Sequence, residues 1–335
     1  MSRMITHVLY LLLAISVATT AQATDLTDIP QESGFSGFIN VGGAYGRVKS
    51  NLVADFGQER TDTLTGSPDG QSIGTPLLIG NLRYTLVNSR TQIFLGNNME
   101  DFVRYDITNQ IGVRQEIGRA GIIGVSGLFS GFATQVWKDP YVTGQNRQET
   151  DRTSTGARIA WNKIFGSNLH LQFSQRKFEL DNENSGNFLG LTQAQQALLN
   201  REGDQRVLKA TYVFDINQRH IIVPAVISSE FDLDGKSMSH DQKGVKLTYT
   251  YRGDPIIWIA NIAYSQSDYD EVNPIFGIKA DAEDVEVSLR GLYRSPFGWK
   301  KWSLMGSVGF YESNSDIDFY DGEVTVASLS MFRRF

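Results

Sequence analysis

Apolar and polar residues alternate over the segment from Val245 to Arg252, where odd-numbered positions are apolar and even-numbered ones polar or charged. Side chains of a β-strand point to opposite faces with a period of two, so a strand with one apolar and one polar face is predicted here. The alternation recurs in two later segments, one with Ile256, Trp258, Ala260, Ile262 and Tyr264 and one with Val285, Val287, Leu289 and Tyr293. Soluble sandwiches and membrane barrels both produce this pattern.

The connections between the expected strands alternate in length. Long polar segments lie at 50–75, 97–101, 138–152, 179–204, 232–242, 270–282 and 314–321, and tight turns lie between them at 88–90, 117–119, 165–168, 217–219, 252–255 and 295–298. Outer-membrane barrels combine long extracellular loops with short periplasmic turns. The sequence therefore predicts an all-β, transmembrane, antiparallel up-and-down β-barrel of about 14 strands. Twelve strands are the alternative, because Thr91–Gly96 is short for a spanning strand of roughly 9–11 residues and Gly121–Val136 does not alternate cleanly.

The first residues have the three parts of a secretory signal peptide. Arg3 supplies the positive charge, Val8–Val17 the apolar stretch, and Ala21–Ala23 the small-residue cleavage site. We therefore expect a cleaved signal peptide at 1–23, a short periplasmic segment at 24–33 and the barrel at 34–335. The segment at 24–33 is too short for an N-terminal plug domain.

The last residues resemble the assembly signal of bacterial outer-membrane barrels. The chain ends on Phe335, with Met331 and Leu329 at alternate positions before it. Arg333 departs from the pattern, because that position is usually apolar or aromatic. We expect the outer-membrane assembly machinery to bind this strand.

Composition limits the cofactors and partners. The sequence contains no cysteine, which excludes disulfides and thiolate metal sites, and we predict no cofactor and no metal site. Beyond the signal peptide no apolar run is long enough for a transmembrane helix, which leaves the closed barrel as the way to span a membrane. The formal net charge of −6 argues against nucleic acid as a partner.

Aromatic residues gather beside the tight turns, where a barrel carries its periplasmic aromatic girdle. A sandwich core does not explain this placement. The residues are Tyr84, Trp161, Phe165, Tyr212, Phe214, Tyr251, Tyr293, Trp299 and Trp302.

The segment Ile29–Asn40, with Val48–Asn51 after it, resembles the N-terminus of a family of outer-membrane proteins from gamma-proteobacteria. That family carries only the label domain of unknown function 2860. The resemblance implies an outer-membrane β-barrel over the whole mature chain, and it implies no activity and no functional residues.

If the apolar face of each strand meets lipid, the alternate positions face the lumen. Arginine or lysine at mid-depth on the lipid face costs about 2–4 kcal/mol, so charged residues are expected inside. Rings of basic side chains favour anions in a water-filled pore. Alternatively, these cations pair with carboxylates and only fill the interior. Parity assigns to the lumen Arg83, Arg104, Asp106, Arg114, Arg158, His170, Arg176, Lys209, Lys246, Glu286 and Arg290.

The predicted extracellular loops are acidic, and one of them contains a helix signal. Acidic residues surround the loops at 270–282 and 314–321; they could bind divalent ions that bridge lipopolysaccharide, or be a solvated face. Thr192–Gln195 has the pattern of a capping box, which predicts a short helix through Leu199. This helix could fold over the mouth or lie on the loop surface.

We do not expect an enzyme, because the chain has no Gly-x-Ser-x-Gly motif. His170 and His220 adjoin periplasmic turns, and His240 is placed in an extracellular loop without an evident serine partner. The leading hypothesis is a porin-like channel for small hydrophilic solutes, with anion preference if the lumen is open. The alternatives are a carrier for a longer or more apolar ligand and a non-conducting structural or receptor barrel. Expected partners are outer-membrane lipid, lipopolysaccharide, the assembly machinery and small solutes, and no oligomeric state is predicted.

Overall fold

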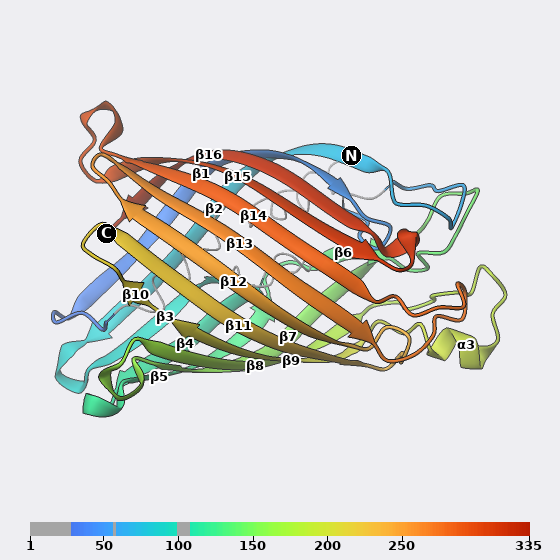
Figure 1. Cartoon of the computed structure of the whole chain (residues 1–335), viewed down its shortest axis with the longest axis horizontal. Coiled ribbons are helices and arrows are strands. Elements are labelled where there is room, and N and C mark those ends of the chain that lie inside the picture. The colour runs from blue at the N-terminus through green and yellow to red at the C-terminus, as the bar shows by residue number, and fades with distance from the viewer. Residues whose placement is uncertain (1–27, 56–57, 99–107) are drawn as a thin grey trace.

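The computed structural model describes residues 28–55, 58–98 and 108–335, and in it the chain forms a closed antiparallel β-barrel (Figure 1). The short element β6 continues β5, because both pair with β7. In the same way β10 continues β9, because both pair with β11. The wall therefore has 14 strands, which confirms the predicted number. The elements are β1 (Gly34–Lys49), β2 (Gly70–Leu86), β3 (Thr91–Asn98), β4 (Thr108–Glu116), β5 (Ile122–Ser130), β6 (Thr134–Trp137), β7 (Glu149–Asn162), β8 (Leu169–Leu180), α3 (Gln193–Ala197), β9 (Gly203–Tyr212), β10 (Phe214–Asp215), β11 (His220–Leu233), β12 (His240–Arg252), β13 (Ile256–Tyr269), β14 (Ala282–Arg294), β15 (Trp302–Ser315) and β16 (Gly322–Arg334).

The first and last strands close the barrel. β1 pairs with β16 from Phe38 opposite Arg334 to Lys49 opposite Glu323. Beyond the last ladder position, the N–H groups of Gly37 and Phe335 each donate to the carbonyl oxygen of the other residue, at 2.9 and 3.1 Å. Closure pairs the edges of the sheet, which a strand barrel needs in lipid because unpaired backbone groups cost several kcal/mol each.

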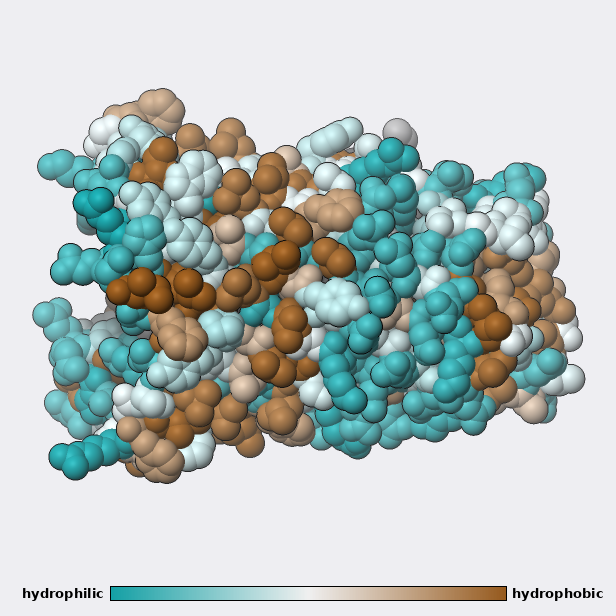
Figure 2. Space-filling model, in the orientation of Figure 1, coloured by the Kyte–Doolittle hydropathy of each residue, from teal (hydrophilic) through white to brown (hydrophobic). Residues whose placement is uncertain are grey.

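The outer surface of the wall carries an apolar belt. Figure 2 shows hydrophobic residues over the half of the wall next to the tight turns and hydrophilic residues beyond them toward the loops. Val245, Leu247 and Ile262 are 43–56% exposed although they lie in the middle of strands β12 and β13. The alternation in the sequence therefore marks an outward apolar face. Among the described residues, no helix is long and apolar enough to cross a membrane.

Three predicted loops end too late, because β2 begins at Gly70, β7 at Glu149 and β12 at His240. The sequence placed these loop ends at 75, 152 and 242. Strands that project beyond the apolar belt need no apolar outer face, so their ends have the polar composition of a loop. In β2 the outward positions in this part are Ser72 and Gly74.

Two prolines lie inside strands at positions where the described pairing with one neighbouring strand stops. Pro224 in β11 pairs with Leu247 but faces the break between β9 and β10 at Val213. Pro76 in β2 lies beyond Asn81, where the described pairing with β3 stops. Proline has no N–H to donate, and sheets accept it only at edges and bulges.

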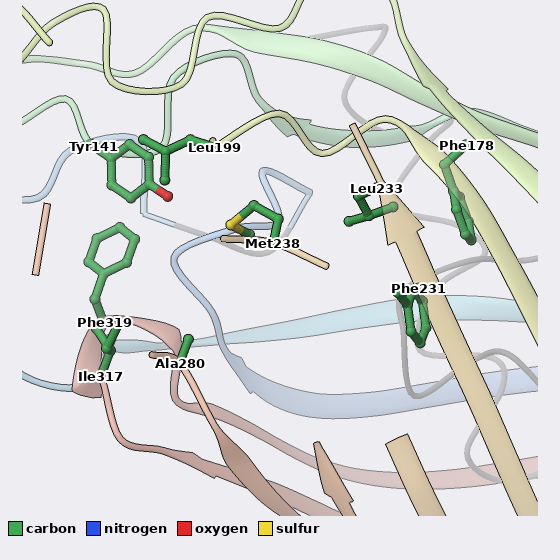
Figure 3. Close-up of a cluster of buried hydrophobic side chains, with 9 residues drawn as sticks. All are labelled: Tyr141, Phe178, Leu199, Phe231, Leu233, Met238, Ala280, Ile317 and Phe319. Carbon is green, nitrogen blue, oxygen red and sulfur yellow. The ribbon is translucent and has the colours of Figure 1, made fainter. Parts of the chain in front are cut away.

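The long loops pack together over the loop end of the barrel (right in Figure 1). Their centre is a cluster that we call the loop core, formed by residues from loops and from the ends of β8 and β11. In Figure 3, Phe178, Phe231 and Leu233 project from the strand ends, Tyr141 and Phe319 face each other, and Met238 lies between the two groups. The members of the loop core are Tyr141, Phe178, Leu199, Phe231, Leu233, Met238, Ala280, Ile317 and Phe319.

The helix α3 lies in the loop between β8 and β9, at the loop end of the barrel. Thr192 caps it, with its hydroxyl accepting from the N–H of Gln195 and the side chain of Gln195 accepting from the N–H of Thr192. The predicted capping box is therefore confirmed. The helix ends at Ala197, two residues before the predicted end.

Candidate functional site

Two cavities lie inside the barrel, one above the other. The upper chamber, on the loop side, has a volume of about 380 Å³, and the lower chamber, on the turn side, about 710 Å³. Arg158, Gln172, Lys209 and Lys246 line both chambers. They therefore lie where the chambers meet, and we call Arg158, Lys209 and Lys246 the cationic layer.

The strand alternation fixes the direction of these three cations. In the ladder, Arg158 of β7 pairs with Ser174 of β8, which pairs with Val207 of β9. Lys209 of β9 pairs with Gln172 of β8. Their chain neighbours Ile159 and Leu208 are 54% and 55% exposed on the outer face. Since successive side chains point to opposite faces, an exposed apolar neighbour holds each cation inward.

Lys246 has a carboxylate partner across two strands. It pairs in the ladder with Ala263 of β13, which pairs with Glu286 of β14. The Nζ atom of Lys246 lies 3.4 Å from Oε1 of Glu286. Both side chains are largely buried, with 12% and 15% of their surfaces exposed. The ion pair holds the ammonium group at the boundary of the two chambers.

The lower chamber is strongly basic. Among the described residues that line it, nine are lysine or arginine and two are aspartate, Asp28 and Asp215. Several guanidinium groups donate to amide oxygens of the wall: Arg83 Nε to Asn81 at 2.7 Å, Arg114 Nη1 to Gln92 at 3.3 Å and Arg158 Nη1 to Gln110 at 3.4 Å. An amide oxygen orients a guanidinium group and leaves its positive charge unchanged. The described lining of the lower chamber therefore carries many more basic than acidic side chains.

The upper chamber has more apolar walls and a mixed charge. Five of its described lining residues are lysine or arginine, and three are acidic: Asp284, Glu286 and Asp321. Asp284 accepts hydrogen bonds from Gln242 Nε2 at 2.7 Å, Ser265 Oγ at 3.0 Å and Tyr311 Oη at 3.0 Å. The apolar walls come from Leu52, Val53, Val136, Phe178, Leu180, Phe231, Leu233, Met238 and Tyr269.

Three rings stack across neighbouring strands at the side of the upper chamber. The ring of His240 lies 4.3 Å from that of Phe231 and 4.5 Å from that of Tyr269, at angles of 17° and 21°. All three residues occupy one row of the ladder from β11 to β13. The expected position of His240 in a loop is therefore wrong. Strand β12 begins at His240, where the imidazole ring packs between the rings of Phe231 and Tyr269 on the two neighbouring strands.

The structure places the predicted lumen residues as follows. Arg83, Arg114 and His170 line the lower chamber, and Glu286 lines the upper one. Arg176 and Arg290 are 2% and 3% exposed and line neither chamber; Arg176 donates to Gln205 at 2.7 Å. Arg104 and Asp106 lie outside the described residues.

Parity assigned charged residues to the lumen but missed the apolar walls of the upper chamber. Phe178 and Leu180 have the same parity as Arg176, and Phe231 and Leu233 have the same parity as Ser229. Extending the parity count to the strand ends would have found them. The part of the chain that the structure describes contains no cluster of three or more histidine, cysteine or acidic residues that could hold a metal ion.

The turn end of the barrel and the last strand carry the other predicted residues. Phe335 is 52% exposed at the turn end, and the guanidinium of Arg333 lies 5.6 Å from the ring of Trp302; Leu329, 60% exposed, lies in the middle of β16. The first described residues run along the lower chamber, which Asp28 and Pro30 line. Arg90 donates to the carbonyl oxygens of Ile29 and Pro30 at 2.7 and 2.6 Å, and these bonds hold the segment against the turns.

Polar groups tie the loops together around the loop core. The hydroxyl of Tyr320 accepts from Asn273 Nδ2 at 2.8 Å and is hydrogen-bonded to the hydroxyl of Tyr141. Burial raises the pKa of Tyr141 and of Tyr320 well above the ordinary value. Burial lowers the pKa of Arg147 to about 10, and its guanidinium lies 4.5 Å from the ring of Trp137. The loops are thus a packed layer with neutral phenols inside.

Comparison with known proteins gives a family and a set of similar folds. The profile of the family described as "Protein of unknown function (DUF2860)" matches residues 34–332. No curated protein matches the chain.

Solved structures that resemble the chain are barrels of low sequence identity. The outer membrane channel DcaP of Acinetobacter baumannii is 10% identical with a TM-score of 0.49, over 91% of this chain and 97% of that one. A FadL homologue from Pseudomonas aeruginosa is 12% identical with a TM-score of 0.45, over 89% and 90%. An anion-selective porin from Comamonas acidovorans is 10% identical with a TM-score of 0.40, over 91% and 100%.

Proposed function

The chain belongs to the DUF2860 family of proteins of unknown function, and we propose that it acts in the outer membrane as a channel for small hydrophilic solutes with a preference for anions. Three features of the barrel support the location. It is closed, it carries an apolar belt, and short turns lie at one end and long loops at the other. This is the arrangement of outer-membrane barrels.

The cationic layer carries the proposed selectivity. Among the described residues, Arg158, Lys209 and Lys246 are the charged ones that line both chambers, so a solute that moves between the chambers passes them. The lower chamber adds further cations on the same path. A positive lining lowers the free energy of an anion in the pore and raises that of a cation.

The test is the conductance of the purified protein in planar lipid bilayers, with the reversal potential measured in a chloride salt gradient. We expect discrete conductance steps and anion selectivity. Lys209→Glu should shift the anion-to-cation permeability ratio toward cations by about fivefold or more, since a unit charge about 4 Å from an ion in water contributes about 1 kcal/mol.

Lys243→Glu is the matched control, because Lys243 is an exposed residue on the outer side of β12 and lines neither chamber. This variant makes the same change in net charge and should leave the permeability ratio unchanged. A protein without discrete conductance would remove the channel, and cation selectivity of the wild type would remove the role of the cationic layer.

A carrier for a longer or more apolar ligand is the second candidate. It is favoured by the apolar walls of the upper chamber and by the loop core, which packs on the ends of β8 and β11 beside that chamber. Saturable conductance that one ligand blocks would support the carrier. Conductance that rises linearly with any small solute would support the general channel.

A further inference from the structure

We infer that the upper chamber binds an amphipathic monoanion, an aryl or alkyl carboxylate, with its apolar body against the apolar walls and its carboxylate on Lys209 and Lys246 of the cationic layer. The inference rests on the proposed anion preference and on the second candidate above, because it names the class of more apolar anion that the barrel would take. The site lies in the loop-side half of the lumen. A general channel requires only an open path there, whereas the inference requires a binding site.

The walls of the upper chamber suit an apolar body. Phe178 and Phe231 lie two residues before the ends of β8 and β11, and Leu233 and Met238 continue this surface toward the loops. Val53 and Val136, which are bridged to each other in the backbone, line it as well. A pore for inorganic or fully hydrophilic anions gains nothing from such walls, whereas an apolar solute gains free energy when it leaves water for them.

The volume of the chamber limits the size of that body. A cavity of about 150 Å³ in a protein core holds one benzene molecule. The upper chamber, at about 380 Å³, has roughly two and a half times that volume. Benzene has six carbon atoms, so the fitting ligand has up to roughly 15 non-hydrogen atoms, as in an aromatic acid with a short side chain.

The charges of the chamber give the ligand one orientation. Lys209, Lys246 and Arg158 lie at its boundary with the lower chamber, and these three cations outnumber the one carboxylate beside them, Glu286, which pairs with Lys246. Both lysines carry amino groups that can donate to a ligand carboxylate. Asp284 lies elsewhere on its wall, held by three neutral donors. A carboxylate is attracted to the first position and repelled from the second. The ligand should therefore carry a single negative charge, at the end that faces the cationic layer.

Phenylbutyrate is the probe for the test, and two relatives isolate its parts. Acetate has the carboxylate without the apolar body, and phenylbutanol has the body without the charge. Binding of labelled phenylbutyrate to the purified wild-type protein is measured by equilibrium dialysis, and block of the chloride current is measured in planar bilayers. We expect saturable binding and block by phenylbutyrate, with acetate and phenylbutanol each weaker by about tenfold or more, as expected for the loss of a charge-assisted hydrogen bond or of the apolar contact.

Two pairs of variants locate the site. Ala263→Phe places a ring in the upper chamber beside Lys246, and Ala260→Phe places the same ring on the outer face of the same strand. Lys209→Met removes a charge from the layer, and Lys243→Met removes one from the outer surface. The first member of each pair should weaken phenylbutyrate binding by about tenfold or more, and the second should leave it unchanged.

The outcomes separate the inference from the proposed channel. Anion-selective conductance without phenylbutyrate binding would overturn the inference and leave the channel. Equal binding of phenylbutyrate and phenylbutanol, or equal effects of the inner and outer variants, would also overturn it. Phenylbutyrate binding with the expected variant effects, in a protein without conductance, would support the site and overturn the channel.

Discussion

An arginine on the outer face of β13 should destabilise the barrel only where the strand crosses the apolar belt. Ile262 and Gln266 lie on the same strand and the same face, four positions apart. Ile262 is 53% exposed among apolar neighbours of the belt, whereas Gln266 is exposed beyond the belt and donates to Glu283 at 3.2 Å. At about 3.4 Å per residue, four positions separate the two side chains by roughly 14 Å along the strand.

The magnitude follows from the depth in the membrane. Arginine on the lipid face costs about 2–4 kcal/mol at the bilayer midplane and about 0–1 kcal/mol near the interface. Ile262→Arg should therefore lower the free energy of unfolding by about 2–4 kcal/mol. Gln266→Arg should change it by less than about 1 kcal/mol, since the new cation also lies beside Glu283.

The assay is reversible unfolding of the barrel in lipid vesicles by a denaturant, followed by tryptophan fluorescence. The difference between the two variants is the quantity of interest, because it cancels the intrinsic cost of arginine in a strand. Equal destabilisation by both variants would refute the belt as a lipid-facing surface. Destabilisation by Gln266→Arg alone would reverse the assigned membrane position.

Three further predictions concern the loops. Phe319→Ala should destabilise the loop core by about 3–5 kcal/mol, since Phe319 is 1% exposed and its ring lies 5.4 Å from that of Tyr141. The loops of the intact barrel should then be proteolysed faster, and an effect no larger than that of the exposed control Phe188→Ala would contradict the prediction. Arg201→Met should lower the free energy of unfolding by about 3–5 kcal/mol, because it leaves the buried carboxylate of Glu183, 2.7 Å away, without its cation. In thermal unfolding, the additional change Glu183→Gln should restore much of this loss, and no restoration would argue against the ion pair. Alkaline pH should loosen the loop core, because burial raises the pKa of Tyr141 and Tyr320 above the usual value of about 10. Unfolded loops release these protons at lower pH than folded ones, so stability that is present below about pH 10 is lost as the pH rises above it. Phenolate absorbance should show a late-titrating group that Tyr141→Phe reduces.

The sequence was sufficient to predict the barrel because the wall repeats one simple rule. Alternation over Val245–Arg252 identified β12, and the order of long and short connections led to the 14 strands that the structure shows. Both signals are local, since each depends on residues close in the chain. They failed at strand ends such as Gly70, where the strand leaves the apolar belt and the outer face becomes polar.

The candidate site was less accessible from the sequence. Parity gives the side of the wall on which Lys209 or Lys246 lies, but two chambers that share these residues are a property of the closed barrel. The loop core joins Tyr141, Met238 and Phe319, which come from three separate loops. No periodic pattern links such residues, so their packing became visible only in three dimensions.

Reactivity of single cysteines along β12 in lipid vesicles tests the central claim most directly, namely that the barrel has an apolar exterior and a charged lumen. The chain contains no cysteine, so each variant carries one thiol. With a charged, water-soluble thiol reagent on both sides of the membrane, Lys246→Cys and Thr248→Cys should react and Val245→Cys and Leu247→Cys should not. Reaction at the odd-numbered positions, or equal reaction at all four, would contradict the account.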